Sequence, residues 1–178
     1  MKKKITFNGK PVTLTGDMLE EGNKAPDFTV VSQDMKEISL ADLKNKIKVF
    51  TSFISLDTPV CDLQVKEFNR RAAKLSSNVV VVGISKDLPF AQKRFCETNK
   101  IKNVKVFSDY KFSSFGLNYG LLVNELNLLA RSIIIADKNN TVRYVQLVEE
   151  LTQAPDYEEA LSKLDDIIKK STPSVKLF

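Results

Sequence analysis

Histidine is absent from this chain of 178 residues. Its absence excludes Cys–His and Ser–His catalysis, and it removes the side chain on which the usual zinc sites depend. A nucleophile in this protein must therefore be activated by arginine, lysine, backbone groups or the dipole of a helix.

Cysteine is scarce, and its spacing excludes the familiar dithiol motif. The chain has two cysteines, Cys61 and Cys96. No second cysteine lies three residues from Cys61, because Gln64 and Thr58 occupy those positions. The missing Cys-x-x-Cys pair disfavours a reductase of the thioredoxin type.

The chain also lacks the long apolar runs that mark export or membrane insertion. Three lysines at residues 2–4 precede a short apolar stretch that residues 8–11 interrupt, which argues against a signal peptide. No stretch is long enough to span a bilayer. Two cysteines without an export signal are typical of thiols in a reducing compartment. We therefore predict a cytoplasmic protein with no membrane partner.

The composition predicts one globular domain with a solvated, charged surface. Hydrophobic residues make up 43% of the chain, which is enough to build a buried core. We expect the domain to cover residues 1–170 and residues 171–178 to form a flexible tail. The net charge of +5 is not accompanied by a zinc-finger spacing, a basic heptad segment or an aromatic-basic repeat. Nucleic-acid binding is therefore not predicted.

The order of hydrophobic patterns predicts an α/β fold. Residues 5–14 alternate around Asn8-Gly9 and indicate an N-terminal β-hairpin. Strands are then expected at residues 28–31, 47–54, 78–84, 104–107, 132–136 and 142–148, and helices at 39–44, 58–75, 89–99, 111–120 and 156–170. This order predicts a thioredoxin-like fold with a mixed central sheet and helices on both faces.

The segment at residues 56–61 carries the strongest chemical signal. Thr58 suits the N-cap of a helix, Pro59 suits its first position, and Cys61 then falls at the third. A thiolate there would face unpaired backbone N–H groups and the positive end of the helix dipole, which both favour the ionised sulfur. The Thr58 hydroxyl can also hydrogen-bond this thiolate. Alternatively, Cys61 is a small hydrophobic residue that begins a buried helix face.

Cys96 and Arg131 are the other residues that could take part in chemistry. Cys96 lies late in its expected helix, so it is either a less acidic thiol or a buried spectator. A disulfide between two helices needs Cα atoms within about 7 Å, which here requires local unwinding. Arg131 opens an apolar strand, where a buried cation needs an anion. It forms either a structural ion pair or a contact that stabilises a thiolate and an oxyanion.

Several motifs together resemble the thiol peroxidase branch of the peroxiredoxins, the atypical two-cysteine bacterial enzymes. The resemblance extends from the N-terminal hairpin to about residue 164. The matching segments are Gly22-Asn23-Lys24-Ala25-Pro26-Asp27-Phe28, Ser55-Leu56-Asp57-Thr58-Pro59-Val60-Cys61, Phe107-Ser108-Asp109, Tyr119-Gly120, Leu129-Ala130-Arg131-Ser132, and Gln146-Leu147-Val148 through Pro155-Asp156-Tyr157-Glu158.

The resemblance implies a role for each of these side chains. Cys61 would be the peroxidatic nucleophile, Thr58 its hydroxyl partner, Arg131 its cationic partner and Cys96 the resolving thiol. It also implies alkyl hydroperoxides and hydrogen peroxide as substrates, a sulfenic acid on Cys61, an intramolecular disulfide, reduction by thioredoxin, a homodimer, and no metal or organic cofactor. Ile54 departs from the family, which has a proline seven residues before the nucleophile to shape the pocket.

Two other functions fit the same residues. In a redox sensor or interaction module, oxidation of Cys61 would alter binding to a partner without turnover. In a thioredoxin-like fold with inert buried cysteines, Cys61 would react slowly with alkylating reagents. Peroxide consumption over many turnovers distinguishes an enzyme from both alternatives.

Overall fold

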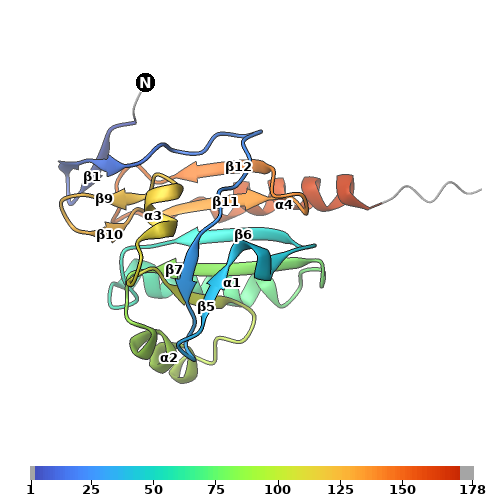
Figure 1. Ribbon diagram of the computed structural model, residues 1–178, viewed down its shortest axis with the longest axis horizontal. Helices are drawn as coiled ribbons and strands as arrows, with labels where there is room; N and C mark the ends of the chain where they lie inside the picture. Colours follow the sequence, from blue (N-terminus) through green and yellow to red (C-terminus); the bar gives the residue numbers. More distant parts are fainter. Residues whose placement is uncertain (1–2, 173–178) are drawn as a thin grey trace, which may run out of the picture.

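The computed structural model of the protein describes residues 3–172 and contains a large sheet with helices packed against it (Figure 1). The helices are α1 (Pro59–Ala72), α2 (Pro89–Thr98), α3 (Ser114–Asn118) and α4 (Tyr157–Ser171), with a 3-10 helix, η1, at Leu40–Leu43. Each helix lies where the hydrophobic pattern predicted one. The α/β prediction is therefore confirmed.

Seven strands form the central sheet in the order β12-β11-β6-β7-β8-β4-β5. Their bounds are β4 (Thr29–Val31), β5 (Glu37–Ser39), β6 (Ile47–Ser52), β7 (Val79–Ser85), β8 (Lys105–Ser108), β11 (Ser132–Ala136) and β12 (Val142–Leu147). The pairs β6/β7 and β7/β8 are parallel, whereas β11 runs antiparallel to both β6 and β12. The mixed sheet expected from the sequence is thus confirmed.

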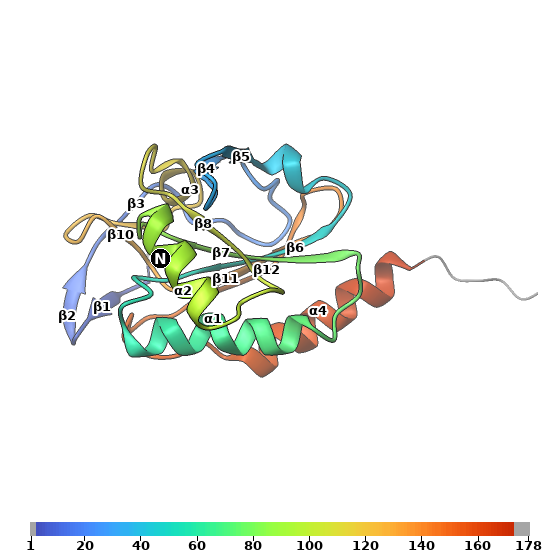
Figure 2. The ribbon, with the colours of Figure 1, turned by 90° about the horizontal axis from the view of Figure 1, so that it is seen from below.

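The inner strands are buried on both faces, which explains why their sequences are almost uninterrupted apolar runs. Every residue of β6 and β11 is buried, and so is every residue of β7 after Val79. Helices α1 and α4 lie side by side on one face (Figure 2). The rings of Phe68 and Tyr157 meet edge to face between them, with their centroids 5.5 Å apart. Helix α3 lies beside β4 on the opposite side (Figure 2). The prediction of helices on both faces is therefore confirmed.

The N-terminal hairpin consists of β1 (Ile5–Phe7) and β2 (Lys10–Val12), which pair antiparallel. Asn8 and Gly9 have φ angles of 51° and 75°, as a tight hairpin turn requires. The Glu150 carboxylate accepts hydrogen bonds from both of their backbone N–H groups, at 2.8 and 3.3 Å. The hairpin predicted from Asn8-Gly9 is confirmed, and Glu150 attaches its turn to the segment that follows β12.

Some elements could not be read from the sequence. The short strands β3 (Leu14–Thr15), β9 (Leu122–Val123) and β10 (Leu128–Leu129) form a separate sheet in the order β10-β9-β3. Neither β3 as a separate strand nor β5 was predicted, because such short strands are defined by partners distant in the sequence.

The C-terminal helix is slightly longer than predicted. Helix α4 includes Ser171, which was expected to begin the tail, and the rest of that tail from residue 173 lies outside the described residues. Within residues 3–172, no helix combines the length and the apolar character that crossing a membrane would need.

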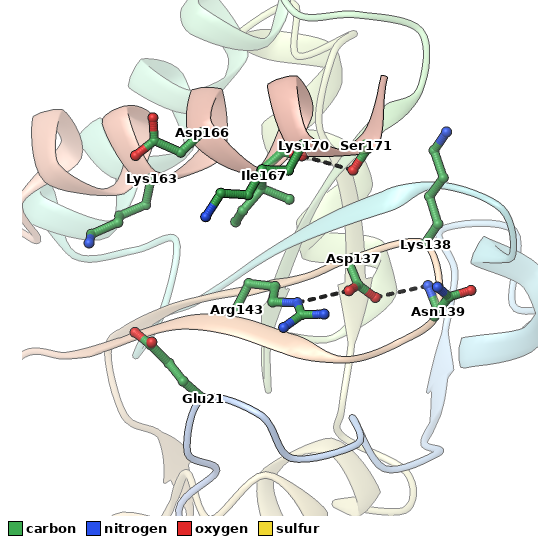
Figure 3. A pocket seen from close by; sticks show the side chains of 10 residues that line it. All are labelled: Glu21, Asp137, Lys138, Asn139, Arg143, Lys163, Asp166, Ile167, Lys170 and Ser171. Carbon is green, nitrogen blue, oxygen red and sulfur yellow. Dashed lines mark hydrogen bonds and ion pairs between the residues drawn. The ribbon is translucent and has the colours of Figure 1, made fainter. Parts of the chain in front are cut away.

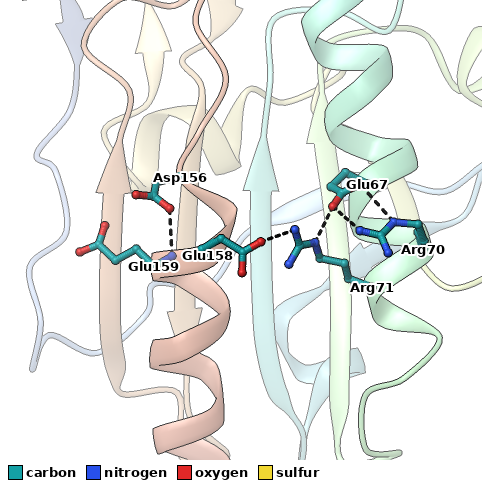
Figure 4. A network of polar contacts seen from close by, with 6 residues as sticks. All are labelled: Glu67, Arg70, Arg71, Asp156, Glu158 and Glu159. Carbon is teal, nitrogen blue, oxygen red and sulfur yellow. Dashed lines mark hydrogen bonds and ion pairs between the residues drawn. The ribbon is translucent and has the colours of Figure 1, made fainter.

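Helices α1 and α4 are joined by a network of charged side chains (Figure 4). Glu67 accepts hydrogen bonds from Arg70 and Arg71, and Arg71 also pairs with Glu158 of α4 at 2.5 Å. Hydrogen bonds from the two arginines hold the pKa of Glu67 at about 2, below its ordinary value of 4.5. Glu67 therefore stabilises the fold above pH 4.5, and this contribution is lost as the pH falls toward 2.

We expect Glu67→Gln to remove part of the acid sensitivity of the fold. The free energy of unfolding, measured by urea titration between pH 5 and 2, should fall less steeply in this variant than in the wild type, because one carboxylate with a lowered pKa is missing. Glu20→Gln, a substitution outside this network, is the control. Equal slopes for wild type and Glu67→Gln would contradict the prediction.

Candidate functional site

Cys61 occupies the third position of α1, as the sequence predicted. Thr58 is at the N-cap with extended backbone angles, φ −102° and ψ 143°, and Pro59 is the first helical residue. The Cys61 side chain is 0% exposed. Its sulfur therefore lies in the first turn of the helix, where backbone N–H groups and the helix dipole favour negative charge.

Thr58 occupies the predicted N-cap position, but the side-chain bond expected of a cap is absent. Thr58 makes no side-chain capping bond, and its hydroxyl donates to the Ser55 carbonyl oxygen at 3.0 Å. The Thr58 backbone N–H donates to the same oxygen at 3.1 Å. The hydroxyl proton is therefore used in the turn before α1, while the lone pairs of Oγ1 are left to accept a hydrogen bond.

Arg131 is brought to Cys61 by the pairing of β11 with β6. Ser132, the next residue, pairs with Ser52 at the end of β6, where the chain leaves the sheet toward α1. The guanidinium Nη2 of Arg131 lies 3.2 Å from the Cys61 sulfur, and Arg131 is only 1% exposed. Arg131 was predicted to open this strand and lies immediately before it, since β11 begins at Ser132. The register of the sheet puts Arg131 beside Cys61.

The Arg131 guanidinium is fixed by neutral oxygens. Nε and Nη2 donate to the Leu151 carbonyl at 3.1 and 2.9 Å, and Nη1 donates to Gln64 Oε1 at 2.6 Å. Among residues 3–172, no carboxylate lies within ion-pair distance of Arg131. Because no anion neutralises this buried cation, its charge is available to an ionised Cys61 sulfur. Within the described part of the chain, Arg131 therefore does not form the structural ion pair that was the alternative prediction.

Gln64 is part of the site, which was not predicted: from the sequence it was notable only because it stands where a Cys-x-x-Cys motif would have its second cysteine. It is 0% exposed, accepts from Arg131, and donates to Thr51 Oγ1 and the Ser52 carbonyl. It therefore connects the guanidinium to the end of β6. One feature of the sequence could have predicted this role: Gln64 is a polar residue that lies one helical turn after Cys61, on the same apolar face of the helix.

Cys96 has a different environment. It lies in the last turn of α2, is 7% exposed, and its sulfur accepts a hydrogen bond from Gln33 Nε2 at 3.3 Å. Burial raises the pKa of the Cys96 thiol above its ordinary value. Cys61 and Cys96 are both free thiols, and their hydrogen-bond partners come from different elements. The structure therefore assembles Cys61 and Arg131 into one site and leaves Cys96 apart from it.

Hollows in the surface lie both near this site and away from it. One of 200 Å³ separates Leu56 and Asp57, in the turn before α1, from α2. Another, of 610 Å³, lies between α4 and the β11–β12 turn and is lined by charged side chains of both signs, including Lys163, Asp166 and Arg143 (Figure 3). A third, of 750 Å³, lies between the N-terminal segment and β12. Neither cysteine lines any of these hollows.

Comparison with known proteins identifies the family of this chain. Residues 20–161 match the family described as Redoxin. The chain is 46% identical over 165 residues to a thiol peroxidase of Bacillus subtilis, an alignment that covers 93% of this chain and 98% of the relative. The chain belongs to the thiol peroxidase family. A thiol peroxidase of Halalkalibacterium halodurans is 45% identical, with 88% of this chain and 94% of the relative covered.

Solved structures of related proteins have a fold similar to that of this chain. A peroxiredoxin-like protein from Aquifex aeolicus has a TM-score of 0.87 and 40% identity, with 94% of this chain and 98% of that chain covered. A thiol peroxidase from Chromobacterium violaceum has a TM-score of 0.84 at 18% identity, with 96% and 100% covered, which shows the same fold. As a thiol peroxidase, the protein is an oxidoreductase that uses a thiol to reduce peroxides.

Proposed function

We propose that this thiol peroxidase reduces alkyl hydroperoxides and hydrogen peroxide at Cys61. The observation that carries the proposal is the 3.2 Å contact between the Cys61 sulfur and the Arg131 guanidinium, at the first turn of α1. A helix N-terminus and a buried cation together favour the thiolate, which is the nucleophilic form of cysteine. Apolar, buried Phe53, Leu56 and Leu121 favour alkyl hydroperoxides among the substrates.

In the first step, the Cys61 thiolate attacks the terminal oxygen of the hydroperoxide in line with the O–O bond. The S–O bond forms as the O–O bond breaks, and the leaving alkoxide or hydroxide takes a proton to become alcohol or water. Arg131 and the Cys61 backbone N–H stabilise the negative charge on the leaving oxygen. Thr58 Oγ1 accepts a hydrogen bond from the hydroperoxide O–H and so orients it. Cys61 becomes a sulfenic acid.

In the second step, Cys96 resolves the sulfenic acid. The Cys96 thiolate attacks the Cys61 sulfur, hydroxide leaves as water after protonation, and an intramolecular disulfide forms. Because Cys61 contacts Arg131 and Cys96 contacts Gln33, the first turn of α1 must unwind before the sulfurs can meet. Burial raises the pKa of the Cys96 thiol, which favours its protonated form while it stays buried.

Thioredoxin then returns the enzyme to its dithiol form. Its two thiols supply the two electrons that reduce the Cys61–Cys96 disulfide, so no metal or organic cofactor is needed. This cycle requires a reducing compartment, and we therefore place the enzyme in the cytoplasm. The two thiols are free in the structure, which is the form that reacts with peroxide.

We also propose that the enzyme is a homodimer. Leu88 and Phe90 flank the start of α2 and are 51% and 66% exposed, which is unusual for large apolar side chains so close together. Burying them against a second copy would remove this apolar surface from water. Sedimentation equilibrium of the purified chain measures the oligomeric state directly.

The Cys96→Ser variant tests the proposed cycle. With thioredoxin, thioredoxin reductase and NADPH, the wild type should consume peroxide over many turnovers, whereas Cys96→Ser should stop after about one equivalent per chain because its sulfenic acid is not resolved. Mass spectrometry without reductant should find the disulfide only in the wild type. A wild type that also stops after about one equivalent would instead indicate a redox sensor.

A further inference from the structure

The turn that precedes Cys61 is held by one carboxylate from another part of the chain. Asp87, between β7 and α2, accepts hydrogen bonds from the Ser55 hydroxyl at 2.7 Å and from the Leu56 backbone N–H at 2.9 Å. Its Oδ2 also accepts from the Ser85 hydroxyl at 2.6 Å. Hydrogen bonds to an ionised carboxylate are roughly twice as strong as those between neutral groups. Asp87 is therefore a strong attachment point for this turn.

Asp87 is itself held in place by the sheet. Its backbone carbonyl accepts from the Ser108 hydroxyl at the end of β8, and Gln92 of α2 donates to Ser85 Oγ at 3.1 Å and to the Phe107 carbonyl at 2.8 Å. Gln92, Ser85 and Ser108 are each 0% exposed. The carboxylate is thus presented by a rigid part of the fold, whereas the turn that it holds belongs to the segment that must move.

The contact with Asp87 controls the whole turn through Ser55. The Ser55 carbonyl accepts from both the backbone N–H and the hydroxyl of Thr58, and Ser55 Oγ accepts from the Asp57 backbone N–H at 3.1 Å. Ser55 therefore positions the N-cap of α1. Since Asp87 holds Ser55, it also determines where the first turn of the helix, with Cys61, begins.

We propose that Asp87 is a positioning residue that sets the balance between the two steps of the reaction. While the turn is held, Thr58 stays at the N-cap of α1, and Cys61 stays beside Arg131 for the attack on peroxide. When the turn leaves Asp87, the start of α1 is free to unwind and Cys61 can reach Cys96, which is carried by α2, the helix that follows Asp87. The 200 Å³ hollow lined by Leu56, Asp57 and Asp87 lies between these two segments.

This inference rests on the proposed disulfide cycle and predicts a large change in its second step with little or no loss in the first. Ser55→Ala removes one hydrogen bond to the carboxylate, and Asp87→Asn places an amide N–H where an acceptor is needed. Either change should raise about tenfold the fraction of molecules in which the turn at residues 55–58 has left Asp87. We expect the rate constant of disulfide formation to rise about tenfold, while the rate constant of the reaction with peroxide falls by a smaller factor or stays the same.

Stopped-flow kinetics on the reduced protein, followed by quenched mass spectrometry, separate these two rate constants. Asp42→Asn is the matched control, because Asp42 also holds a turn, through the Ser39 backbone N–H at 2.8 Å, but lies in η1. The control should leave both rate constants unchanged. Faster disulfide formation and less over-oxidised Cys61 in both test variants would support the proposal. Disulfide formation that is unchanged or slower in folded Ser55→Ala would overturn it.

A second readout does not depend on catalysis. Hydrogen exchange of backbone amides at residues 55–61 should be about tenfold faster in Ser55→Ala than in the wild type, with no change in α4. Unchanged exchange in this segment would also overturn the proposal. A wild type that reacts with peroxide without forming the disulfide would overturn the proposed cycle instead, so the two failures are distinguishable.

Discussion

Replacing Cys61 with serine will reduce peroxide consumption to the background rate. The loss should be at least about a thousandfold, because a serine hydroxyl stays protonated at neutral pH and cannot replace the thiolate as nucleophile. The substitution removes little volume from a buried position, so the fold should persist. Peroxide loss in the thioredoxin-coupled assay, together with circular dichroism of the variant, measures both effects.

Cys96→Ser is the matched control for this experiment. It has the same chemical change at the other buried thiol, but it keeps Cys61 and should therefore still react with about one equivalent of peroxide. Substantial turnover by Cys61→Ser would reject Cys61 as the nucleophile. It would leave membership of the thiol peroxidase family untouched, since that rests on 46% identity across most of the chain.

Replacing Arg131 with methionine should slow the reaction with peroxide by about a hundredfold to a thousandfold. The guanidinium is the only side chain among residues 3–172 that donates a hydrogen bond to the Cys61 sulfur. Its removal takes away both the charge that favours the thiolate and a donor to the leaving oxygen. The second-order rate constant, measured by stopped flow in a single turnover, reports this loss directly.

The same variant should also be less stable, by about 2–3 kcal/mol, because Gln64 Oε1 and the Leu151 carbonyl lose a buried donor. The two effects can be separated with Gln64→Ala, which loosens the guanidinium but leaves it in place. We expect Gln64→Ala to lose stability of similar size with a much smaller loss of rate. A rate constant for Arg131→Met close to that of Gln64→Ala would show that Arg131 acts only through the fold.

Ile54 stands where the family has a proline, and the structure shows where this residue lies. It follows the end of β6 after Phe53, is 4% exposed and belongs to the hydrophobic core. Isoleucine keeps a backbone N–H that proline lacks, and its φ angle is not fixed by a ring. The turn at residues 55–58 therefore depends on the hydrogen bonds to Asp87 and Ser55 for its shape.

Features set by neighbouring residues could be predicted from the sequence. The hairpin at Asn8-Gly9 and the start of α1 at Thr58-Pro59 depend on backbone preferences of two or three residues, and both lie where they were predicted. The direction of the Thr58 hydroxyl could not be predicted in this way. It depends on the Ser55 carbonyl, whose own position is fixed by Asp87, a residue in another segment.

Local patterns and caps predict the α/β class, the helix that begins at Pro59 and the place of Cys61 in its first turn. The contact between the Cys61 sulfur and Arg131, 70 positions away, and the hold that Gln64 and Leu151 have on the guanidinium arise from the packing of distant segments. The physical reason is that the antiparallel register of β11 against β6 fixes which side chains meet, and no local pattern records that register.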